Sequence, residues 1–453
     1  MKLSTTEKIG YGLGDTASNF FFQTFNIFLL YYYTDVFGLA PAAVGTMFLL
    51  ARFWDAVNDP MMGVIADRTN TRSGKYRPYL LWVAIPYGVL GYLIFANPDL
   101  GPNGKLVYAY VTYIAMMMVY TAINVPYSAL MGVMTPSSEE RTSLSSYRFV
   151  CAFGGGFLVS LAVRPLVREL GGGDEVKGFQ YTMAIFGVVS ILLFWLTYAT
   201  TRERVKPAVQ KISLRDDFSA LLRNTPWLVM VAAAVLTLAN VAVRGAVTVH
   251  FFKYVVGDTG ESFLLGIDRT TLVMSSGMLA FIAGVFFTPV VGRRFGKRNA
   301  LMTLTLLNAA TVLGFYFIPA DQYWLMVAVN LIGNFFAGPT PALVWAMYAD
   351  VADYGEWKFN RRSTALVFSA AMFAQKMGLT IGGSLSGWML GLYGFVPNQP
   401  QTPETLSGIR IMFCIVPGVL AVANGLVLLG YRLTDAKVAE IEKELATRRL
   451  APQ

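Results

Sequence analysis

Arg52, Asp55, Asn58 and Asp59 lie in a segment that is otherwise apolar, LLARFWDAVNDPMMG at residues 49–63. In a helix, Asp55 and Asp59 are one turn apart and Asn58 follows Asp55 by three residues, so their oxygen atoms share one face. A charged side chain at the centre of a bilayer costs about 2.5–3.5 kcal/mol on insertion scales, and neighbouring carboxylates repel each other unless a cation lies nearby. The pattern predicts that the two aspartates bind a proton, a metal cation or a basic partner.

Two interpretations of these residues stay open. Arg52 lies one turn before the aspartates and could form a structural ion pair with them. Alternatively, two carboxylates and one amide supply several oxygen ligands, which hard monovalent cations require. The second interpretation predicts a site for a coupling cation.

A second polar face lies in VTYIAMMMVYTAINVPYSALMGVM, residues 111–134. Tyr120 and Asn124 are four residues apart and share one helical face, which offers a sugar ring an aromatic surface and an amide. Thr121 can turn its hydroxyl toward the aspartates, and Pro126 frees a backbone carbonyl. The alternative is that Asn124 and Thr121 only join neighbouring helices by hydrogen bonds, which is common in membrane proteins.

Arg244 and His250 stand out in a third apolar segment, ANVAVRGAVTVHFFKYV at 239–255. A guanidinium group inside a membrane is by default a candidate functional group, and its planar fork suits a carboxylate or a sulfonate. An interhelical partner for an aspartate or a carbonyl is an equal alternative for Arg244. We expect His250 to be an ordinary polar group near the outer end of its helix rather than a proton relay.

The elements that carry these residues must cross a lipid membrane. Of 453 residues, 55% are hydrophobic and 14% are charged, whereas about 25% are charged in soluble domains. Apolar runs reach the length of about 20 residues that spans a bilayer, and they are continuous, unlike the alternating strands of a membrane barrel. The composition predicts an all-α integral membrane protein. Cys151 and Cys414 lie in apolar runs and are expected to be small buried residues.

Twelve apolar segments follow one another along the chain, near residues 17–37, 41–64, 78–96, 107–131, 145–167, 180–200, 227–252, 263–291, 299–318, 323–348, 364–393 and 408–431. Lys and Arg gather in alternate connectors, as in Arg68, Arg72, Lys75 and Arg77. By the positive-inside rule these connectors are cytoplasmic, which predicts a multi-pass protein of the bacterial cytoplasmic (inner) membrane with both termini inside. The net charge of +9 is spread over all of these connectors, so nucleic acid is not an expected partner.

The longest polar stretch, TTRERVKPAVQKISLRDDFSALLRNTP at 200–226, separates two halves of six segments. The connector GVIADRTNTRSGKYRP (63–78) is weakly repeated as VVGRRFGKRNA (290–300). We therefore expect a six-helix bundle at 1–200, a cytoplasmic loop at 201–226, a second six-helix bundle at 227–433 and a cytoplasmic tail at 434–453. Paired bundles around a central site are typical of alternating-access carriers.

With these features the chain resembles the glycoside–pentoside–hexuronide:cation symporters of the major facilitator superfamily, the family of the melibiose carrier. The resemblance runs from KIGYGLGD (8–15) to YRLTD (431–435). Its most specific motifs are YYYTDVFGL (31–39), GTMFLLARFWDAVNDPMMG (45–63), SGKYRP (73–78), NVPYSAL (124–130), ADVADYGEW (349–357) and QTPETLSGIR (401–410). The resemblance implies twelve transmembrane helices in the major facilitator fold and uptake of a sugar with Na⁺, Li⁺ or H⁺.

The resemblance also assigns roles to single residues. The cation site would be Asp55, Asn58, Asp59 and Thr121, a complete set that favours Na⁺. Lys376 would be the family's central lysine, which neutralises the carboxylates when the cation is absent. The substrate site would comprise Asn19, Tyr120, Asn124, Arg148 and Trp345, with Lys376 nearby. Arg244 of the seventh segment is added to this set from its own chemistry and not from the resemblance.

The expected sugar site departs from the melibiose carrier at Asn19 and Asn124, where that carrier has carboxylates that bind galactosyl hydroxyls. Ser18 and Ser128 likewise stand in place of a lysine and a tryptophan. Because an amide both donates and accepts hydrogen bonds, galactoside specificity is not implied. The loss of two negative charges beside Arg148, together with Arg244, favours an acidic sugar such as a glucuronide. Xylosides and neutral glycosides stay open.

Charged residues at the cytoplasmic ends of two segments form an expected gate, which would pair across the two bundles in the outward-open state. Its members are Asp67, Arg68, Asp350, Asp353 and Glu356. A single surface pair contributes at most about 1 kcal/mol, but a network that breaks in each cycle can bias a two-state equilibrium. Each member could equally be part of a solvated helix end.

Other functions are weighed against this one. A membrane enzyme would need a nucleophile, a metal cluster or an acid–base pair at a membrane face, and one histidine with two scattered cysteines supplies no such set. A lysolipid or drug carrier on the same fold is the stronger rival, and a proton-coupled carrier for neutral glycosides is another. We expect no cofactor besides the co-transported cation, a small sugar or glycoside and membrane lipid as partners, and function as a monomer.

Overall fold

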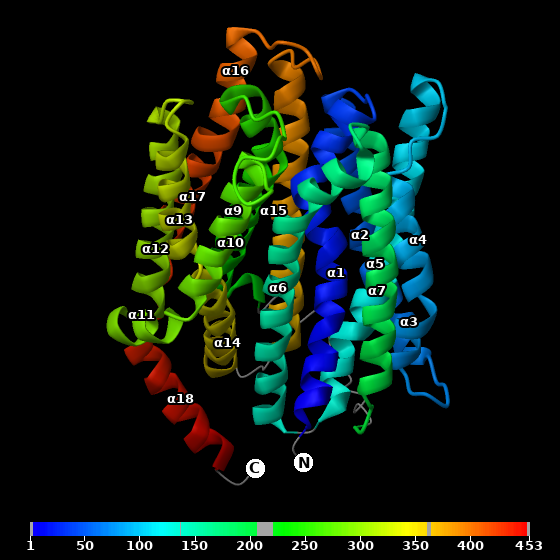
Figure 1. The fold of residues 1–453 in the computed structure, drawn as a ribbon. Coiled ribbons are helices and arrows are strands. Elements are labelled where there is room, and N and C mark those ends of the chain that lie inside the picture. The colour runs from blue at the N-terminus through cyan, green and yellow to red at the C-terminus, as the bar shows by residue number, and fades with distance from the viewer. Residues whose placement is uncertain (1–2, 136, 206–220, 360–363, 451–453) are drawn as a thin grey trace. The chain divides into compact units, whose positions relative to one another are not determined.

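The computed structural model describes residues 3–135, 137–205, 221–359 and 364–450. Within these ranges the chain is helical, and pairing between extended residues is limited to two isolated bridges (Figure 1). Some side chains within helices, among them those of Arg52, Asp55 and Asp67, lie outside the description. The chain forms two compact units. Unit 1 comprises Met1–Val209, Thr248–Ser275 and Gly387–Thr405, and unit 2 comprises Gln210–Val247, Ser276–Ser386 and Leu406–Gln453.

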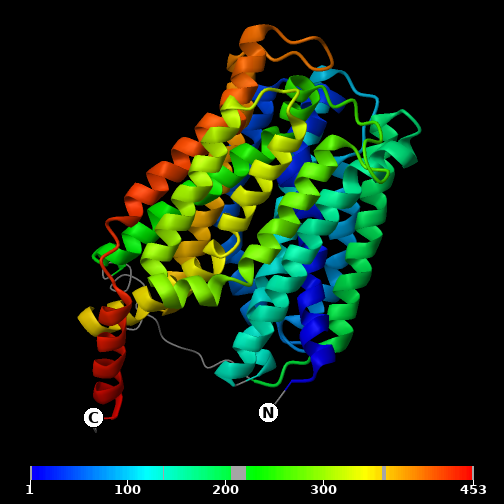
Figure 2. The ribbon, with the colours of Figure 1, turned by 60° about the vertical axis from the view of Figure 1, so that its left-hand side comes forward.

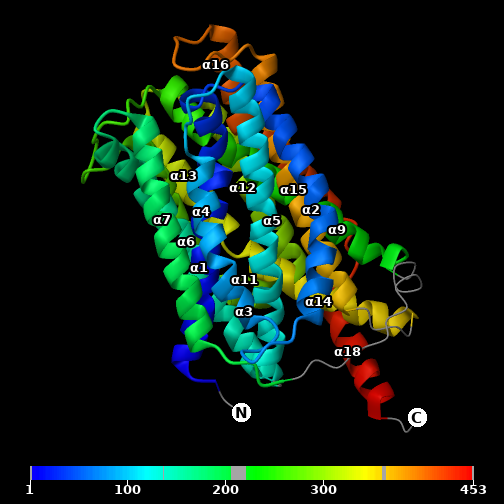
Figure 3. The ribbon, with the colours of Figure 1, turned by 90° about the vertical axis from the view of Figure 1, so that its right-hand side faces the viewer.

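Unit 1 is built on three long helices that run side by side, α1, α6 and α7 (Figure 1). Helix α2 lies along α5, and α4 packs on both α5 and α7 (Figure 3). The elements of this unit are α1 (Thr5–Tyr31), η1 (Tyr32–Val36), α2 (Pro41–Arg68), α3 (Arg77–Trp82), α4 (Ala84–Ile94), α5 (Pro102–Met134), α6 (Ser138–Gly171), α7 (Glu175–Thr200) and η2 (Phe251–Val256).

Unit 2 is organised around α12, which packs on α13 and α17 (Figure 2). The elements that lie wholly in it are α11 (Thr288–Phe295), α12 (Lys297–Gly314), η3 (Phe315–Phe317), α13 (Tyr323–Ala337), α14 (Thr340–Phe359), η4 (Ile411–Ile415), α17 (Val416–Leu428) and α18 (Asp435–Leu450). Four helices begin in one unit and end in the other: α9 (Thr225–His250), α10 (Arg269–Val285), α15 (Thr364–Leu392) and α16 (Pro403–Arg410).

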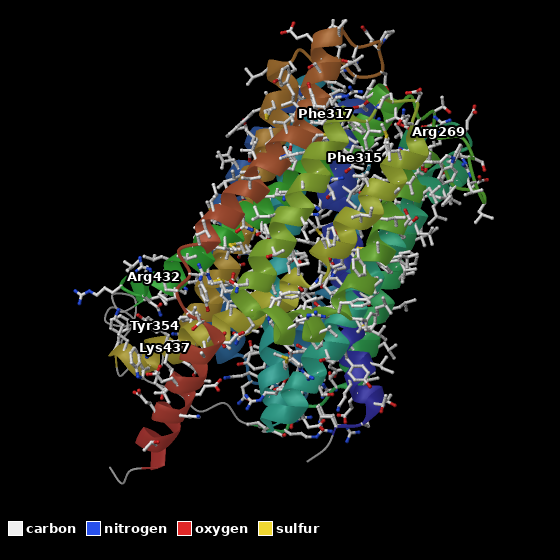
Figure 4. All side chains as sticks on the ribbon, turned by 90° about the vertical axis from the view of Figure 1, so that its left-hand side faces the viewer. Arg269, Phe315, Phe317, Tyr354, Arg432 and Lys437 are labelled. Atoms are coloured by element: carbon white, nitrogen blue, oxygen red, sulfur yellow. The ribbon has the colours of Figure 1, made fainter. Side chains whose placement is uncertain are left out.

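The two ends of unit 2 differ in chemistry. Phe315 and Phe317 lie toward one end, whereas Tyr354, Arg432 and Lys437 lie toward the other (Figure 4). At that second end the tail forms helix α18, which packs on α14. Trp357 of α14 donates from Nε1 to Glu444 at 2.6 Å, and Lys437 lies 4.9 Å from the centre of the same indole ring. Residues Asp435–Leu450 of the predicted tail therefore form a helix.

Glycines bring α1 close to its neighbours in unit 1. A methyl group on Gly12 would lie 2.7 Å from the sulfur of Cys151 on α6, and one on Gly14 would lie 2.5 Å from the ring of Tyr127 on α5. On the facing side, Gly155 of α6 leaves room for the backbone of α1. Small residues at such positions let membrane helices approach closely, and here they press the polar face of α1 against α5 and α6.

Seven of the described helices are long and apolar enough to cross a membrane, and an eighth is formed if α10 and α11, which meet at 51°, act as one bent span. Helices α1 and α2 have 27 and 28 residues, which exceeds the length of about 20 that a span needs. Both carry polar and charged side chains that lower their hydropathy. The division at 1–200 and 227–433 stays a prediction, and residues 206–220 of the middle loop lie outside the described residues.

Candidate functional site

The acidic face of α2 meets helix α5. Thr121 of α5 is buried and donates its hydroxyl to Oδ1 of Asp59 at 2.7 Å. The neighbouring Nδ2 atom of Asn58 is buried and makes no hydrogen bond to any described residue. The side chain of Asp55 lies outside the description, but its place on α2 is one turn before Asp59. Two helices therefore bring three of the four expected cation ligands into one region.

The polar faces of α1 and α5 lie against each other. Ser18 of α1 donates to Oδ1 of Asn124 on α5 at 2.9 Å, and the amide of Asn124 donates to the carbonyl of Tyr120 at 3.0 Å. Asn19, the next residue of α1, donates to the carbonyl of Asp15 at 2.8 Å. Asn19, Tyr120 and Asn124 are all half-buried. The structure thus brings the expected sugar-facing residues of unit 1 together, while their local bonds also join the two helices.

Arg148 of α6 forms an ion pair with Asp15 of α1. Nε donates to one carboxylate oxygen of Asp15, and Nη2 donates to the other at 3.3 Å. Nη2 also lies 3.5 Å from the hydroxyl of Ser128, and the guanidinium carbon lies 5.1 Å from the ring centre of Tyr127. The sequence argument for an acidic sugar considered the loss of two carboxylates at Asn19 and Asn124 and did not consider Asp15, which supplies a carboxylate to Arg148. The acidic sugar stays a prediction.

Asp15 was missed because the first span was predicted to begin at residue 17. Helix α1 begins at Thr5, where Ser4 caps it by accepting from the backbone of Glu7 while the Glu7 side chain bonds back to Ser4. This capping box is a local sequence signal for an earlier start. With the helix extended, Asp15 stands four residues before Asn19 on the same face, and the pattern GLGD-TASN then becomes visible as a second acidic helix face.

Arg244 of α9 lies among aromatic rings of unit 2. Its guanidinium carbon is 4.8 Å from the ring centre of Phe413 and 5.6 Å from that of Phe315, and Nη2 lies 3.4 Å from Oδ1 of Asn330. Stacking on aromatic rings is favourable for arginine in a desolvated site. The hydrogen bond to Asn330 agrees with the alternative in which Arg244 serves as a partner between helices. The two ring contacts fix the orientation of the guanidinium plane.

His250 is more deeply embedded than an ordinary polar group at a helix end. It is fully buried, and its Nε2 lies 3.1 Å from the hydroxyl of Thr34 and 3.3 Å from Oδ2 of Asp35. Asp35 also accepts from Lys253 at 3.0 Å and from Tyr254. This cluster joins η1 to the end of α9 and to η2, and it was not predicted because the partners are more than 200 residues apart.

The remaining predicted residues lie in unit 2, on helices other than α9. Lys376 is half-buried on α15, and its approach to the acidic pair stays a prediction. Trp345 of α14 is half-buried and packs edge-on against Tyr348, with 5.9 Å between ring centres. Asp350 pairs with Lys297 inside unit 2. Its pairing across the two bundles stays a prediction.

The other expected gate residues stay predictions. Asp353 and Glu356 are half-buried on α14, and Arg68 is exposed at the end of α2, while the side chain of Asp67 lies outside the description.

The loop that follows α2 is anchored by Glu203 rather than by a gate residue. Backbone N–H groups of Lys75, Tyr76 and Arg77 donate to the carboxylate of Glu203 at 2.7–2.9 Å. Successive N–H groups of this kind form an anion-binding concavity, which here holds an acidic side chain of the same unit.

The chain is similar in sequence and in fold to known proteins. A family model described as MFS/sugar transport protein matches residues 10–435. The Escherichia coli (strain K12) protein YagG, named as a glycoside/cation symporter, is 39% identical over 452 residues, which are 99% of this chain and 96% of that protein. A glucuronide carrier protein homolog of the same organism is 32% identical over 453 residues, which are 100% and 98% of the two chains. A solved structure of a proton dependent oligopeptide transporter superimposes with a TM-score of 0.67 at 13% identity, covering 97% of this chain and all of the other.

Proposed function

The chain belongs to the MFS/sugar transport protein family, and from this premise we propose that it is a Na⁺-coupled symporter of a sugar or glycoside. Membership makes it a multi-pass membrane transporter of the major facilitator fold and not an enzyme. The cation-coupled sugar assignment is supported by the name of the relative YagG. Na⁺ as the coupling ion is supported by the residues of α2 and α5.

The observation that carries the proposal is the 2.7 Å hydrogen bond between the buried Thr121 of α5 and the half-buried Asp59 of α2. Hard cations take oxygen ligands from carboxylates, amides and hydroxyls. Asp55, Asn58, Asp59 and Thr121 offer such a set from two neighbouring helices. A cation at this place cancels buried negative charge that would otherwise be costly in a membrane.

Coupling follows from the order of residues along α5. Thr121 belongs to the cation set, while Tyr120 precedes it and Asn124 lies less than one turn beyond it. A cation that fixes α2 against α5 also fixes the sugar-facing edge of α5, which raises the affinity for sugar. By linkage, bound sugar raises the affinity for the cation by the same factor. The empty and the doubly loaded carrier then change between outward-facing and inward-facing states.

Replacement of Asp59 by Cys tests this proposal. We expect Na⁺ stimulation of sugar uptake in proteoliposomes to disappear, while some sugar binding persists, because the variant removes one charged ligand and leaves the sugar face intact. Asp99→Cys in an exposed loop is the matched control and should keep full stimulation. Na⁺ stimulation that survives in Asp59→Cys would exclude Asp59 from the coupling site. Stimulation by a proton gradient alone would favour the proton-coupled alternative.

An acidic sugar such as a glucuronide is the second candidate substrate. It is favoured by Arg244, whose guanidinium lies beside the rings of Phe315 and Phe413, and by the relative named as a glucuronide carrier homolog. A lysolipid or drug carrier is the remaining alternative, and it would be recognised by competition from lipids or detergents during transport.

The same family premise extends to the placement of the chain. We propose that the transporter functions as a monomer surrounded by lipid in the bacterial cytoplasmic (inner) membrane, with both termini on the cytoplasmic side. The support is the charge of its connectors, since Lys and Arg recur in alternate loops and such loops remain inside.

A further inference from the structure

The ion pair of Asp15 and Arg148 is a buried feature that the proposed coupling mechanism does not use. Asp15 retains 7% of its accessible surface. Its side chain is 10% exposed, whereas that of Arg148 is 27% exposed. The carboxylate is thus the inner member of the pair and the guanidinium is the member that reaches accessible space. Burying a charge requires a partner, and each residue is the other's charge partner.

The surroundings hold this pair in one geometry. Tyr11 and Tyr127 stack with 4.7 Å between ring centres, and each hydroxyl donates to the other's backbone carbonyl, at 3.1 and 2.6 Å. The guanidinium of Arg148 lies over the Tyr127 ring. Gly14 allows that ring to touch α1 directly. Asp15 therefore has little freedom to move away from Arg148.

The hydrogen bonds of Arg148 are divided unevenly. Nε and Nη2 are engaged by Asp15 and Ser128, while Nη1 makes no hydrogen bond to any described residue. One planar edge of the guanidinium is therefore occupied, and donors remain on the other. The pair also adjoins the sugar-facing residues, because Asn19 donates to the carbonyl of Asp15 and Ser18 donates to Asn124.

The charge of this region follows from these contacts. Asp15 contributes one negative charge and Arg148 one positive charge, so the pair is neutral overall. Asn19 and Asn124 add donors and acceptors without charge. A sugar hydroxyl can accept from Nη1 of Arg148, whereas a sugar carboxylate would meet both the cation and the carboxylate that already neutralises it.

We propose that Asp15 is a specificity-determining positioning residue, which holds Arg148 in a neutral pair so that the carrier prefers uncharged glycosides to anionic ones. Arg148 contacts the sugar, and Asp15 acts through Arg148. This inference rests on the proposed function, since it names the substrate class that the sugar site selects. It also orders the two candidate substrates, because the neutral glycoside becomes the preferred one.

The test compares sugars that differ only in charge. The probes are two matched pairs, 4-nitrophenyl β-D-glucoside with its glucuronide and 4-nitrophenyl β-D-galactoside with its galacturonide. Binding to the purified full-length carrier is measured with Na⁺ present, and the ratio of the two dissociation constants in a pair is the readout. This ratio does not depend on expression level or on the active fraction.

We expect the unmodified carrier to bind the neutral member of at least one pair about tenfold more tightly or better. In Asp15→Asn the ratio should shift toward the acidic member by about tenfold, because hydrogen bonds to a charged group that has lost its partner are worth more than a neutral bond. Asp15→Glu should keep the neutral preference. Asp15→Asn combined with Arg148→Gln should also keep it, since both charges are then absent.

Three outcomes overturn the proposal. The first is an unmodified carrier that prefers the acidic sugar, a result that needs no variant and so stands even if Asp15→Asn fails to fold. The second is an Asp15→Asn variant with normal thermal unfolding and an unchanged ratio, which would leave the proposed function intact. The third is an unmodified carrier that binds no member of either pair and no other glycoside, which removes the proposed function together with this inference.

Discussion

At the residue scale, Thr121 connects the two polar regions of unit 1. Its hydroxyl bonds to Asp59, and its backbone stands beside Tyr120 and before Asn124 on α5. Its hydrogen bond links α5 to α2, and in the proposed cation site the same hydroxyl would supply one oxygen ligand. The hydroxyl matters more than the methyl group, and this distinction can be measured.

Thr121→Val should weaken the activation of sugar uptake by Na⁺ about tenfold, because a hydrogen bond to a charged group contributes about 1.5–3 kcal/mol. Thr121→Ser retains the hydroxyl and should stay near the unmodified carrier. The measurement is the Na⁺ concentration for half-maximal uptake at fixed sugar. A valine variant that matches the unmodified carrier would show that the hydroxyl is not required.

The sequence was sufficient for some of these residues and not for others. Asp59 and Thr121 could be predicted to meet, because an acidic pair in an apolar helix demands partners and the nearby polar helix offers a hydroxyl. The partner of Arg148 could not, because Asp15 lay just outside the expected span. The choice of Lys297 as the partner of Asp350 depends on how α12 and α14 pack, which no local pattern specifies.

At the element scale, the close approach of α1 to α5 and α6 depends on glycines, which have no side chain beyond Cα. Gly14 faces Tyr127 so closely that a methyl group would lie 2.5 Å from its ring. This contact sets the position of the whole polar face of α1, including Asp15 and Asn19. The fit is tested by adding one carbon atom.

Gly14→Ala should destabilise the carrier by about 1–3 kcal/mol, the usual cost of overpacking a well-packed contact, and should lower sugar affinity because α1 moves away from α5. Gly132→Ala on α5 is the control, since a methyl group there meets nothing within 4 Å and the change favours a helix by up to about 1 kcal/mol. Thermal unfolding in detergent checks both variants. A Gly14→Ala carrier as stable as Gly132→Ala would mean that the Tyr127 ring can move aside.

Helix ends were harder to predict than helix positions. Three wide π-helical turns, η1, η2 and η4, extend helices α1, α9 and α16, and hydrophobic periodicity does not signal such turns. In unit 1, Asp35 of η1 bonds to His250 at the end of α9 and to Lys253 and Tyr254 of η2. The sequence located His250 at a helix end, but its burial follows from a pairing across more than 200 residues.

At the scale of the whole molecule, the all-helical class and the twelve-segment pattern were predictable. An apolar composition indicates a membrane protein, and continuous apolar runs of about 20 residues indicate helices that span the bilayer. Seven or eight spans are supported by length and hydropathy in the described part of the chain, and the family match covers residues 10–435. The arrangement within each unit was not predictable, since it depends on glycine contacts and distant ion pairs rather than on periodicity.

The orientation of the chain gives a prediction at this scale. In a background with Cys151 and Cys414 replaced, Arg72→Cys should react with a membrane-impermeant maleimide only from the cytoplasmic side, and Asn103→Cys only from outside. Both residues are exposed in the structure, and the charged connectors place them on opposite sides. Labelling of intact cells and of inverted vesicles separates the two. Reaction of both residues from one side would contradict the proposed topology, and exchanged sides would reverse it.

The pairing of Asp15 with Arg148 has an electrical consequence for the whole cycle. Because the two charges cancel and a neutral sugar adds none, the sugar site carries no net charge when the carrier changes between its two states. The cation at the acidic helix would then account for the charge moved in each turnover. One elementary charge gains about 2.3 kcal/mol from 100 mV, roughly a fifty-fold accumulation of sugar, so a cell could concentrate the glycoside by its membrane potential even where Na⁺ is equal on both sides.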